Sequence, residues 1–156
     1  MRLTLLPVLL GSAVFLGAGY AATVVLPTAD AANTTRTGDT HEYTRQEAKG
    51  RDIYARQGCV LCHTKQVRDT FSDATLGDRP TRPGDTVADR PGLLGESRFG
   101  PDLTCVGDRA EGTHDEKVEA MMEYLRDPGG SMPSYDYLSD NDLRRLAAYV
   151  VAQECA

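Results

Sequence analysis

The chain has 156 residues, which accommodates one soluble domain beside an apolar N-terminal segment and excludes a large multidomain enzyme. Its 23 acidic residues outnumber its 17 Lys and Arg residues, so a surface that binds nucleic acid is not expected at a formal net charge of -6. Only 6% of the residues are aromatic and none is Trp. This small supply for a hydrophobic core predicts that a cofactor fills part of the interior.

Residues 1–27 are predicted to form a transmembrane anchor. No charged residue occurs from Leu3 to Leu26, and a helix of that length, at about 1.5 Å per residue, spans the roughly 30 Å core of a bilayer. A cleaved signal peptide is the alternative, because small residues follow at Ala29, Ala31 and Ala32. The apolar run exceeds the roughly 7–15 residues usual for a signal peptide, which favours the anchor.

The charges that flank this segment predict its orientation. Arg2 precedes it, and no Lys or Arg follows until Arg36, so the rest of the chain is expected on the extracytoplasmic (periplasmic or outer) side of a single-pass membrane protein. Residues 28–43 have no periodic apolar face and are predicted to be a tether. The soluble domain is then residues 44–156.

Three helices are predicted from capping boxes, in which a Thr or Ser is followed three residues later by an acidic residue. The pairs are Thr44 with Glu47, Thr113 with Glu116, and Ser139 with Asp142, the last with a shorter carboxylate. The first helix is expected to stop at Gly58 and the second before Pro128.

The second and third helices each have one apolar face. Their residues at helical spacing are Val118, Met121, Met122 and Leu125, and Leu143, Leu146, Ala147, Val150 and Val151. Residues 64–100 are rich in Asp, Arg, Gly and Pro and have no helical or strand periodicity, which predicts a long ordered loop inserted in the domain. The expected fold class is all-α.

The string Cys59-Val60-Leu61-Cys62-His63 follows the first predicted helix, and C-x-x-C-H is the attachment signature of c-type haem. Two thiols at this spacing can add to the two vinyl groups of one haem, and the adjoining His can ligate the iron. A thioredoxin-like pair would need a βαβ context, and a zinc site would need a second pair of ligands. Neither is present in the sequence, so one covalently attached haem c is predicted.

Met132 is the predicted sixth iron ligand. It lies in Gly129-Gly130-Ser131-Met132-Pro133, which is not helical and can present a sulfur to a planar cofactor. A packing role in a turn is the alternative for Met132. The other candidates are less suitable: Met121 and Met122 belong to an apolar helix face, His114 begins a helix, and His41 lies in the tether. A thioether ligand suits reversible one-electron transfer.

The order helix, C-x-x-C-H, loop, helix, Met-Pro and terminal helix resembles a class I cytochrome c domain from Thr44 onward. The resemblance implies a crossing of the terminal helices, with Gly50 and Tyr54 on one and Leu146 and Tyr149 on the other. It also implies that the carbonyl of Pro101, in Gly100-Pro101-Asp102-Leu103, accepts a hydrogen bond from His63. Such a contact fixes the ring of a ligand His.

Longer strings resemble the membrane-anchored mono-haem subunit (subunit II) of cbb(3)-type haem-copper oxidases. They are residues 47–54, 58–63, 67–68 and 97–103. This resemblance implies an electron-transfer subunit of the respiratory chain, rather than a catalyst by itself, that passes electrons from a reduced donor to a terminal oxidase. It also makes Arg98 a candidate partner for a haem propionate, the alternative being a solvated loop arginine.

The implied partners are integral-membrane redox subunits such as a haem-copper oxidase core, and an electron donor that is soluble or on the quinol-oxidase side. Alternatives are the cytochrome c subunit of a nitric oxide reductase, a stand-alone membrane-tethered shuttle, and a gas-sensing or peroxidase-type haem protein with an open sixth position. Cys105 and Cys155 are the two cysteines outside the C-x-x-C-H string. A disulfide between them and two free thiols are both compatible with the sequence.

Overall fold

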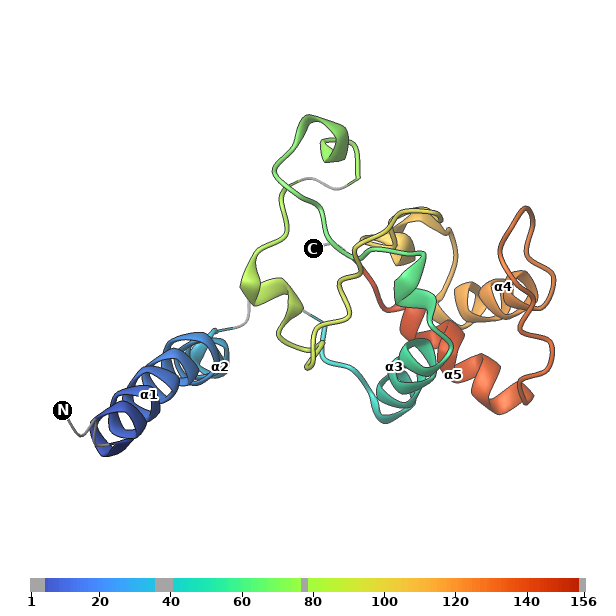
Figure 1. The fold of residues 1–156 in the computed structure, drawn as a ribbon. Coiled ribbons are helices and arrows are strands. Elements are labelled where there is room, and N and C mark those ends of the chain that lie inside the picture. The colour runs from blue at the N-terminus through green and yellow to red at the C-terminus, as the bar shows by residue number, and fades with distance from the viewer. Residues whose placement is uncertain (1–4, 36–40, 77–78, 155–156) are drawn as a thin grey trace. The chain divides into compact units, whose positions relative to one another are not determined.

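The computed structural model describes residues 5–35, 41–76 and 79–154 (Figure 1). The chain divides into two compact units, an N-terminal unit of residues 1–35 and a C-terminal domain of residues 36–156. All regular elements of the described residues are helical, as the predicted all-α class requires.

The N-terminal unit is a long apolar helix. Helix α1 (Leu5–Tyr20), the π-helical turn η1 (Ala21–Val25) and helix α2 (Leu26–Asn33) follow one another without a break. The 26 residues Leu5–Asp30 are long and apolar enough to cross a membrane, by length and composition. The helix continues past residue 27, the predicted end of the anchor, because the Ala-rich run 29–32 favours helix. The rest of the predicted tether includes residues 36–40, which lie outside the described residues.

The C-terminal domain is built on three longer helices, which are α3 (Arg45–Arg56), α4 (His114–Arg126) and α5 (Asp140–Val151). The capping boxes of Thr44 and Thr113 are confirmed in both directions. At α5, the Ser139 hydroxyl accepts a hydrogen bond from the Asp142 amide at 3.2 Å, but the reciprocal bond is not made. The short Asp142 side chain instead accepts a hydrogen bond from Arg145.

The chain leaves α3 through Gly58, whose φ of 72° lies in the left-handed region that favours glycine. The predicted stop is therefore confirmed. Helix α4 ends at Arg126 with Asp127 as its C-cap, directly before Pro128. Both ends agree with the sequence-based prediction.

Helix α5 is the centre of the core. The predicted apolar residues of α5 are all buried, with Leu143, Leu146 and Ala147 completely inaccessible. Three of the four predicted on α4 are buried as well, and Met121 is partly buried against the same core. Both α3 and α4 pack on α5, which Figure 1 shows in red beside them.

Helices α3 and α5 cross in close contact at Gly50. A Cβ atom at this position would lie 1.9 Å from the carbonyl oxygen of Arg145 and 2.8 Å from the Cβ of Tyr149. The rings of Tyr54 and Tyr149 meet edge to face beside the crossing, with centroids 5.3 Å apart. The small-and-aromatic crossing implied by the family resemblance is therefore present.

Residues 64–100 contain no long helix within their described part, as predicted. They include the short 3-10 helices η3 (Phe71–Asp73) and η4 (Pro83–Thr86) and a cis Arg90–Pro91 peptide bond. A third short helix, η5 (Val106–Arg109), follows before α4. The insertion is ordered by its own polar contacts, of which the bidentate pair of Arg79 and Asp85 is one example.

A buried polar cluster joins the insertion to the helix crossing. Asp89 accepts hydrogen bonds from the Tyr149 hydroxyl at 2.9 Å and from Arg51 Nε at 3.1 Å, and the Lys65 ammonium contacts both Asp89 and Tyr149. Desolvation lowers the pKa of Lys65, while the charge of Asp89 acts in the opposite direction. Each buried charge therefore has a partner, as burial requires.

We expect Gly50→Ala to destabilise the domain, because the added methyl group overlaps the backbone of Arg145 and forces α3 away from α5. A loss of roughly 1–3 kcal/mol in the free energy of unfolding is expected for overpacking of this kind. Denaturant titration followed by circular dichroism measures it. Gly92→Ala is the control, since a Cβ there makes only ordinary contacts of 3.8 and 3.9 Å. Equal stability of the two variants would contradict the close crossing.

Candidate functional site

The C-x-x-C-H string forms a tight turn directly after Gly58. Cys59–Leu61 make the 3-10 helix η2, and the amide of His63 donates to the carbonyl of Cys59 at 3.0 Å. The turn places one cysteine inward and one outward, since Cys59 is buried and Cys62 is exposed. Both cysteines are free, so neither is consumed by a disulfide.

The buried thiol of Cys59 faces the core. Its Sγ lies 3.8 Å from the hydroxyl of Tyr135, and burial raises the pKa of the thiol despite this contact. The hydroxyl of Tyr54 is a buried side-chain oxygen without a hydrogen-bond partner. Burial, and secondarily the proximity of Cys59, raises the pKa of Tyr54. A buried hydroxyl without a partner in this region can form a hydrogen bond with an additional bound group.

His63 is oriented by the segment that follows the insertion. Its Nδ1 lies 2.8 Å from the carbonyl oxygen of Pro101. A carbonyl only accepts, so Nδ1 carries the proton and donates, which leaves the lone pair on Nε2. Nε2 is therefore the ring nitrogen that can bind a metal. The contact that the sequence resemblance implied for Pro101 is present.

The backbone of Gly100 covers the His63 ring. A Cβ at this position would lie 2.3 Å from Cε1 and 2.7 Å from Nδ1 of the imidazole. The Gly100 amide also donates to the carbonyl of Cys62 at 2.9 Å. No side chain can be accommodated here while the ring stays in place, so the glycine is a steric requirement of the His63 orientation.

Two more backbone hydrogen bonds fasten residues 94–103 to the residues after the turn. The Lys65 amide donates to the Leu94 carbonyl at 2.7 Å, and the Leu103 amide donates to the Thr64 carbonyl at 2.8 Å. Gly95, with a φ of 74°, approaches so closely that a Cβ would lie 2.3 Å from the His63 carbonyl oxygen. Sequence reasoning missed this glycine, because a lone Gly in a Gly-rich loop gives no signal of its own.

Met132 lies in the segment between α4 and α5, which is not helical, as predicted. Gly130 precedes it in the left-handed conformation, with a φ of 73°. The Met132 side chain is partly buried and packs against the core that contains Tyr135. The Tyr135 amide donates to the Leu125 carbonyl at 2.9 Å and so holds this segment to the end of α4.

The alternative ligands are placed in other roles. Met122 is buried and Met121 partly buried in the α4 face that packs on the core. His114 is the exposed first residue of α4. His41 Nε2 lies 3.0 Å from a carboxylate oxygen of Glu47, at the start of α3. The side chain of Met132 therefore remains the predicted sixth ligand.

Arg98 is held by polar groups of the protein itself, and its contact with a haem propionate stays a prediction. Its guanidinium donates to both carboxylate oxygens of the buried Asp73, at 2.6 and 2.8 Å. Its Nε donates to the Thr64 hydroxyl at 2.7 Å. The guanidinium is therefore partly buried and paired with the carboxylate of Asp73.

Cys105 is disulfide-bonded in the structure. Cys155 lies outside the described residues.

The residues of the C-x-x-C-H turn suit a metal that is already bound by an organic cofactor. Among the described residues, no group of three or more His, Cys, Asp or Glu side chains could hold a metal ion. The C-x-x-C-H turn offers one oriented imidazole and two thiols at covalent-attachment spacing. A porphyrin supplies four nitrogen ligands to iron and needs only axial ligands from the protein, so these residues fit a haem.

The comparison with protein families gives the same answer. Residues 3–154 match the family described as cytochrome C oxidase, mono-heme subunit/FixO. The chain belongs to this family. No curated protein matched the chain.

Membership of the FixO family confirms the resemblance to the mono-haem oxidase subunit and decides against the nitric oxide reductase subunit. The chain is therefore a haem-containing subunit of a cytochrome c oxidase, and its long apolar helix fits membrane anchoring.

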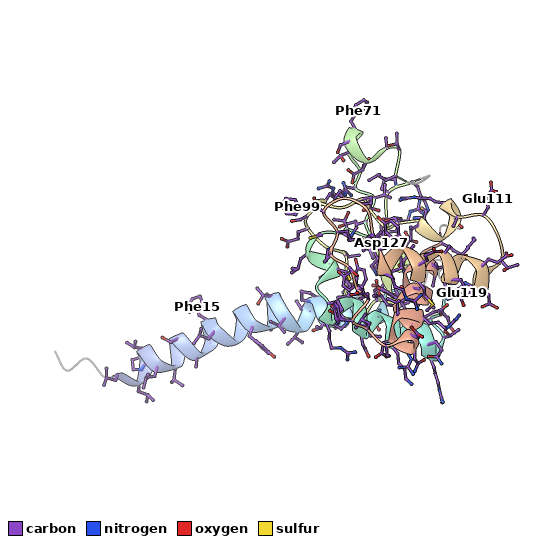
Figure 2. The ribbon with its side chains drawn as sticks, turned by 90° about the vertical axis from the view of Figure 1, so that its right-hand side faces the viewer. Phe15, Phe71, Phe99, Glu111, Glu119 and Asp127 are labelled. Atoms are coloured by element: carbon purple, nitrogen blue, oxygen red, sulfur yellow. The ribbon has the colours of Figure 1, made fainter. Side chains whose placement is uncertain are left out.

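Two apolar side chains are exposed beside the site. Leu61, inside the C-x-x-C-H turn, is 70% exposed, and Phe99, next to the glycine that covers His63, is 89% exposed. Figure 2 shows Phe99 pointing away from the domain. Large exposed hydrophobic side chains next to a functional site are typical of surfaces that contact a partner.

Proposed function

We propose that this FixO-family chain binds one haem covalently and carries electrons, one at a time, from a reduced donor to the membrane-embedded redox subunits of its oxidase. Cys59 and Cys62 attach the porphyrin, and His63 and Met132 ligate the iron. The observation that carries the proposal is the His63 ring, fixed by Pro101 with Nε2 left free, within a C-x-x-C-H turn whose two thiols are unpaired.

The two thiols form thioether bonds in this proposal. Each S–H would add across a vinyl C=C bond, the sulfur to one carbon and the hydrogen to the other, and no oxidant would be consumed. The raised pKa of Cys59 keeps that sulfur as an uncharged thiol, which suits its buried position. Once formed, the two bonds hold the cofactor irrespective of the oxidation state of the metal.

Haem supplies reversible one-electron chemistry when it is bound. His63 and Met132 favour opposite oxidation states: the imidazole, polarised by the Pro101 carbonyl, favours the oxidised state, and the thioether favours the reduced state and raises the potential. With His63 and Met132 as its two protein ligands, the iron would have no open position for a substrate. The chain therefore serves as an electron carrier within the oxidase rather than as its catalyst.

The haem domain is proposed on the extracytoplasmic side, with the N-terminal helix as its anchor. A net charge of -6 favours attraction of a basic electron donor. The exposed Leu61 and Phe99 offer apolar contact area beside the haem site to a redox partner. The anchor keeps the domain at the membrane surface where the oxidase core lies.

Replacement of Cys59 or Cys62 by Ala should abolish one thioether bond each, and replacement of both should abolish covalent attachment. Haem staining of the denatured chain after gel electrophoresis measures this, because only covalently bound haem survives denaturation. The buried Cys59 and the exposed Cys62 should behave alike in this experiment, because each sulfur forms one of the two thioether bonds. Persistent staining of the double variant would contradict the proposal.

Met132→Ala should remove the sixth ligand, so the ferric absorption spectrum should change from low-spin toward high-spin and the midpoint potential should fall. Optical spectroscopy and a redox titration of the purified holoprotein measure the two effects. Met121→Ala is the matched control, because that thioether is also partly buried against the core but belongs to a regular helix. An unchanged spectrum in Met132→Ala would favour an open-site haem protein.

Purification of the full chain in mild detergent through a C-terminal tag tests the proposed partners. We expect b-type haem absorbance in a fixed ratio to the c-type band in a reduced-minus-oxidised spectrum, because the oxidase core should accompany its subunit. A c-type band alone at every mild-detergent condition would favour a stand-alone tethered shuttle.

A further inference from the structure

Arg98 joins two separate stretches of the chain at the back of the His63 site. Besides Thr64 and the two oxygens of Asp73, its guanidinium donates to the Gln66 carbonyl at 2.7 Å and to Asp102 at 3.3 Å. These acceptors come from residues 64–73 on one side and from residue 102 on the other. Arg98 itself lies in the segment that carries Gly100 and Pro101.

Both carboxylates in this cluster are buried. Asp73 is completely inaccessible, and Asp102 is 2% exposed. Hydrogen bonds from Arg98, and next from Arg68, hold the pKa of Asp73 far below its usual range. Asp102 additionally contacts the Thr64 hydroxyl and accepts from the Thr104 amide at 2.8 Å. The ion pair is therefore charged and has well-defined geometry, unlike a surface pair.

The cluster brackets the residue that orients the haem ligand. Arg98 lies three positions before Pro101, and Asp102 directly follows it. Both form hydrogen bonds with the side chain of Thr64, the residue after His63. The carbonyl of Pro101 and the imidazole of His63 thus belong to two segments of the chain. The contacts among Arg98, Asp73 and Asp102 fix the distance between these segments. A change in that separation changes the 2.8 Å contact between Nδ1 and the carbonyl.

We propose that Arg98, together with Asp73 and Asp102, is a positioning residue for the haem ligand His63, and that it sets the reduction potential through the Pro101 hydrogen bond. This inference rests on the proposed haem function. The bond increases the basicity of the ligand imidazole, which stabilises oxidised iron. A weakened bond therefore raises the midpoint potential.

Arg98→Lys is the decisive variant. It keeps the positive charge, but an ammonium lacks the planar fork that reaches Asp73, Thr64 and Asp102 together. The expected result is a higher midpoint potential of the full-length holoprotein, with covalent haem and low-spin optical spectra retained. In the reduced protein, labelled with nitrogen-15, hydrogen exchange of the His63 Nδ1 proton should be about tenfold faster, as expected for weakening of one hydrogen bond.

Arg68→Ala is the matched control. Arg68 also donates to both oxygens of Asp73, at 2.9 and 3.2 Å, but its hydrogen bonds reach neither Thr64 nor Asp102. Removal of its positive charge should lower the potential slightly by electrostatics, the opposite direction to Arg98→Lys, and should leave exchange of the Nδ1 proton unchanged. Asp73→Asn, which weakens the ion pair with Arg98 from the other side, should speed exchange of the Nδ1 proton like Arg98→Lys, and the loss of its negative charge adds to the rise in potential.

The proposal is overturned if Arg98→Lys and Asp73→Asn retain both the wild-type potential and the wild-type exchange rate, even if they unfold more easily. It is also overturned if Arg68→Ala reproduces their rise in potential. Failure of the proposed haem function is distinguishable, since it would appear as absence of covalent haem from the wild-type chain.

Discussion

The attachment of residues 94–103 to the C-x-x-C-H turn is the constraint on which the site depends. Three backbone hydrogen bonds join this segment to Cys62, Thr64 and Lys65. Gly95 and Gly100 make the approach possible, because a Cβ at either position would overlap His63. The Nδ1 proton of His63 and the carbonyl of Pro101 meet only as a result of this packing.

The crossing of α3 and α5 positions the C-x-x-C-H turn, to which residues 94–103 are attached. Gly50 allows α3 to lie against α5, and the C-x-x-C-H turn begins directly after α3, so the position of the crossing determines the position of the turn. Asp89 fastens the middle of the insertion to Tyr149 of α5. The long insertion is thus held at Asp73 and Asp89, two buried carboxylates.

These two attachments explain how a domain with few aromatic residues orders a large irregular segment. Arg–carboxylate pairs have directional geometry, and complete burial makes removal of either partner costly. The exposed apolar side chains Leu61 and Phe99 lie in or beside the C-x-x-C-H turn and the segment that covers it. A subunit of a larger membrane complex has a use for such side chains that a solitary carrier lacks.

Local chemistry made much of this molecule predictable from sequence. The capping boxes of Thr44 and Thr113, the stop at Gly58 and the apolar face of α5 depend on residues within a few positions of one another, and all agree with the structure. The C-x-x-C-H spacing is likewise local, and so is the apolar composition of the first helix, although the helix continues past residue 27, the predicted end of the anchor, to Asn33.

The pairing of Arg98 with Asp73 could not be predicted in this way, because the two residues are distant in the sequence. Asp73 lies 25 positions away in a segment without periodicity, and no sequence pattern relates the two. Only tertiary packing decided that a buried carboxylate of the protein occupies the guanidinium, because the pairing depends on which loops the fold brings together.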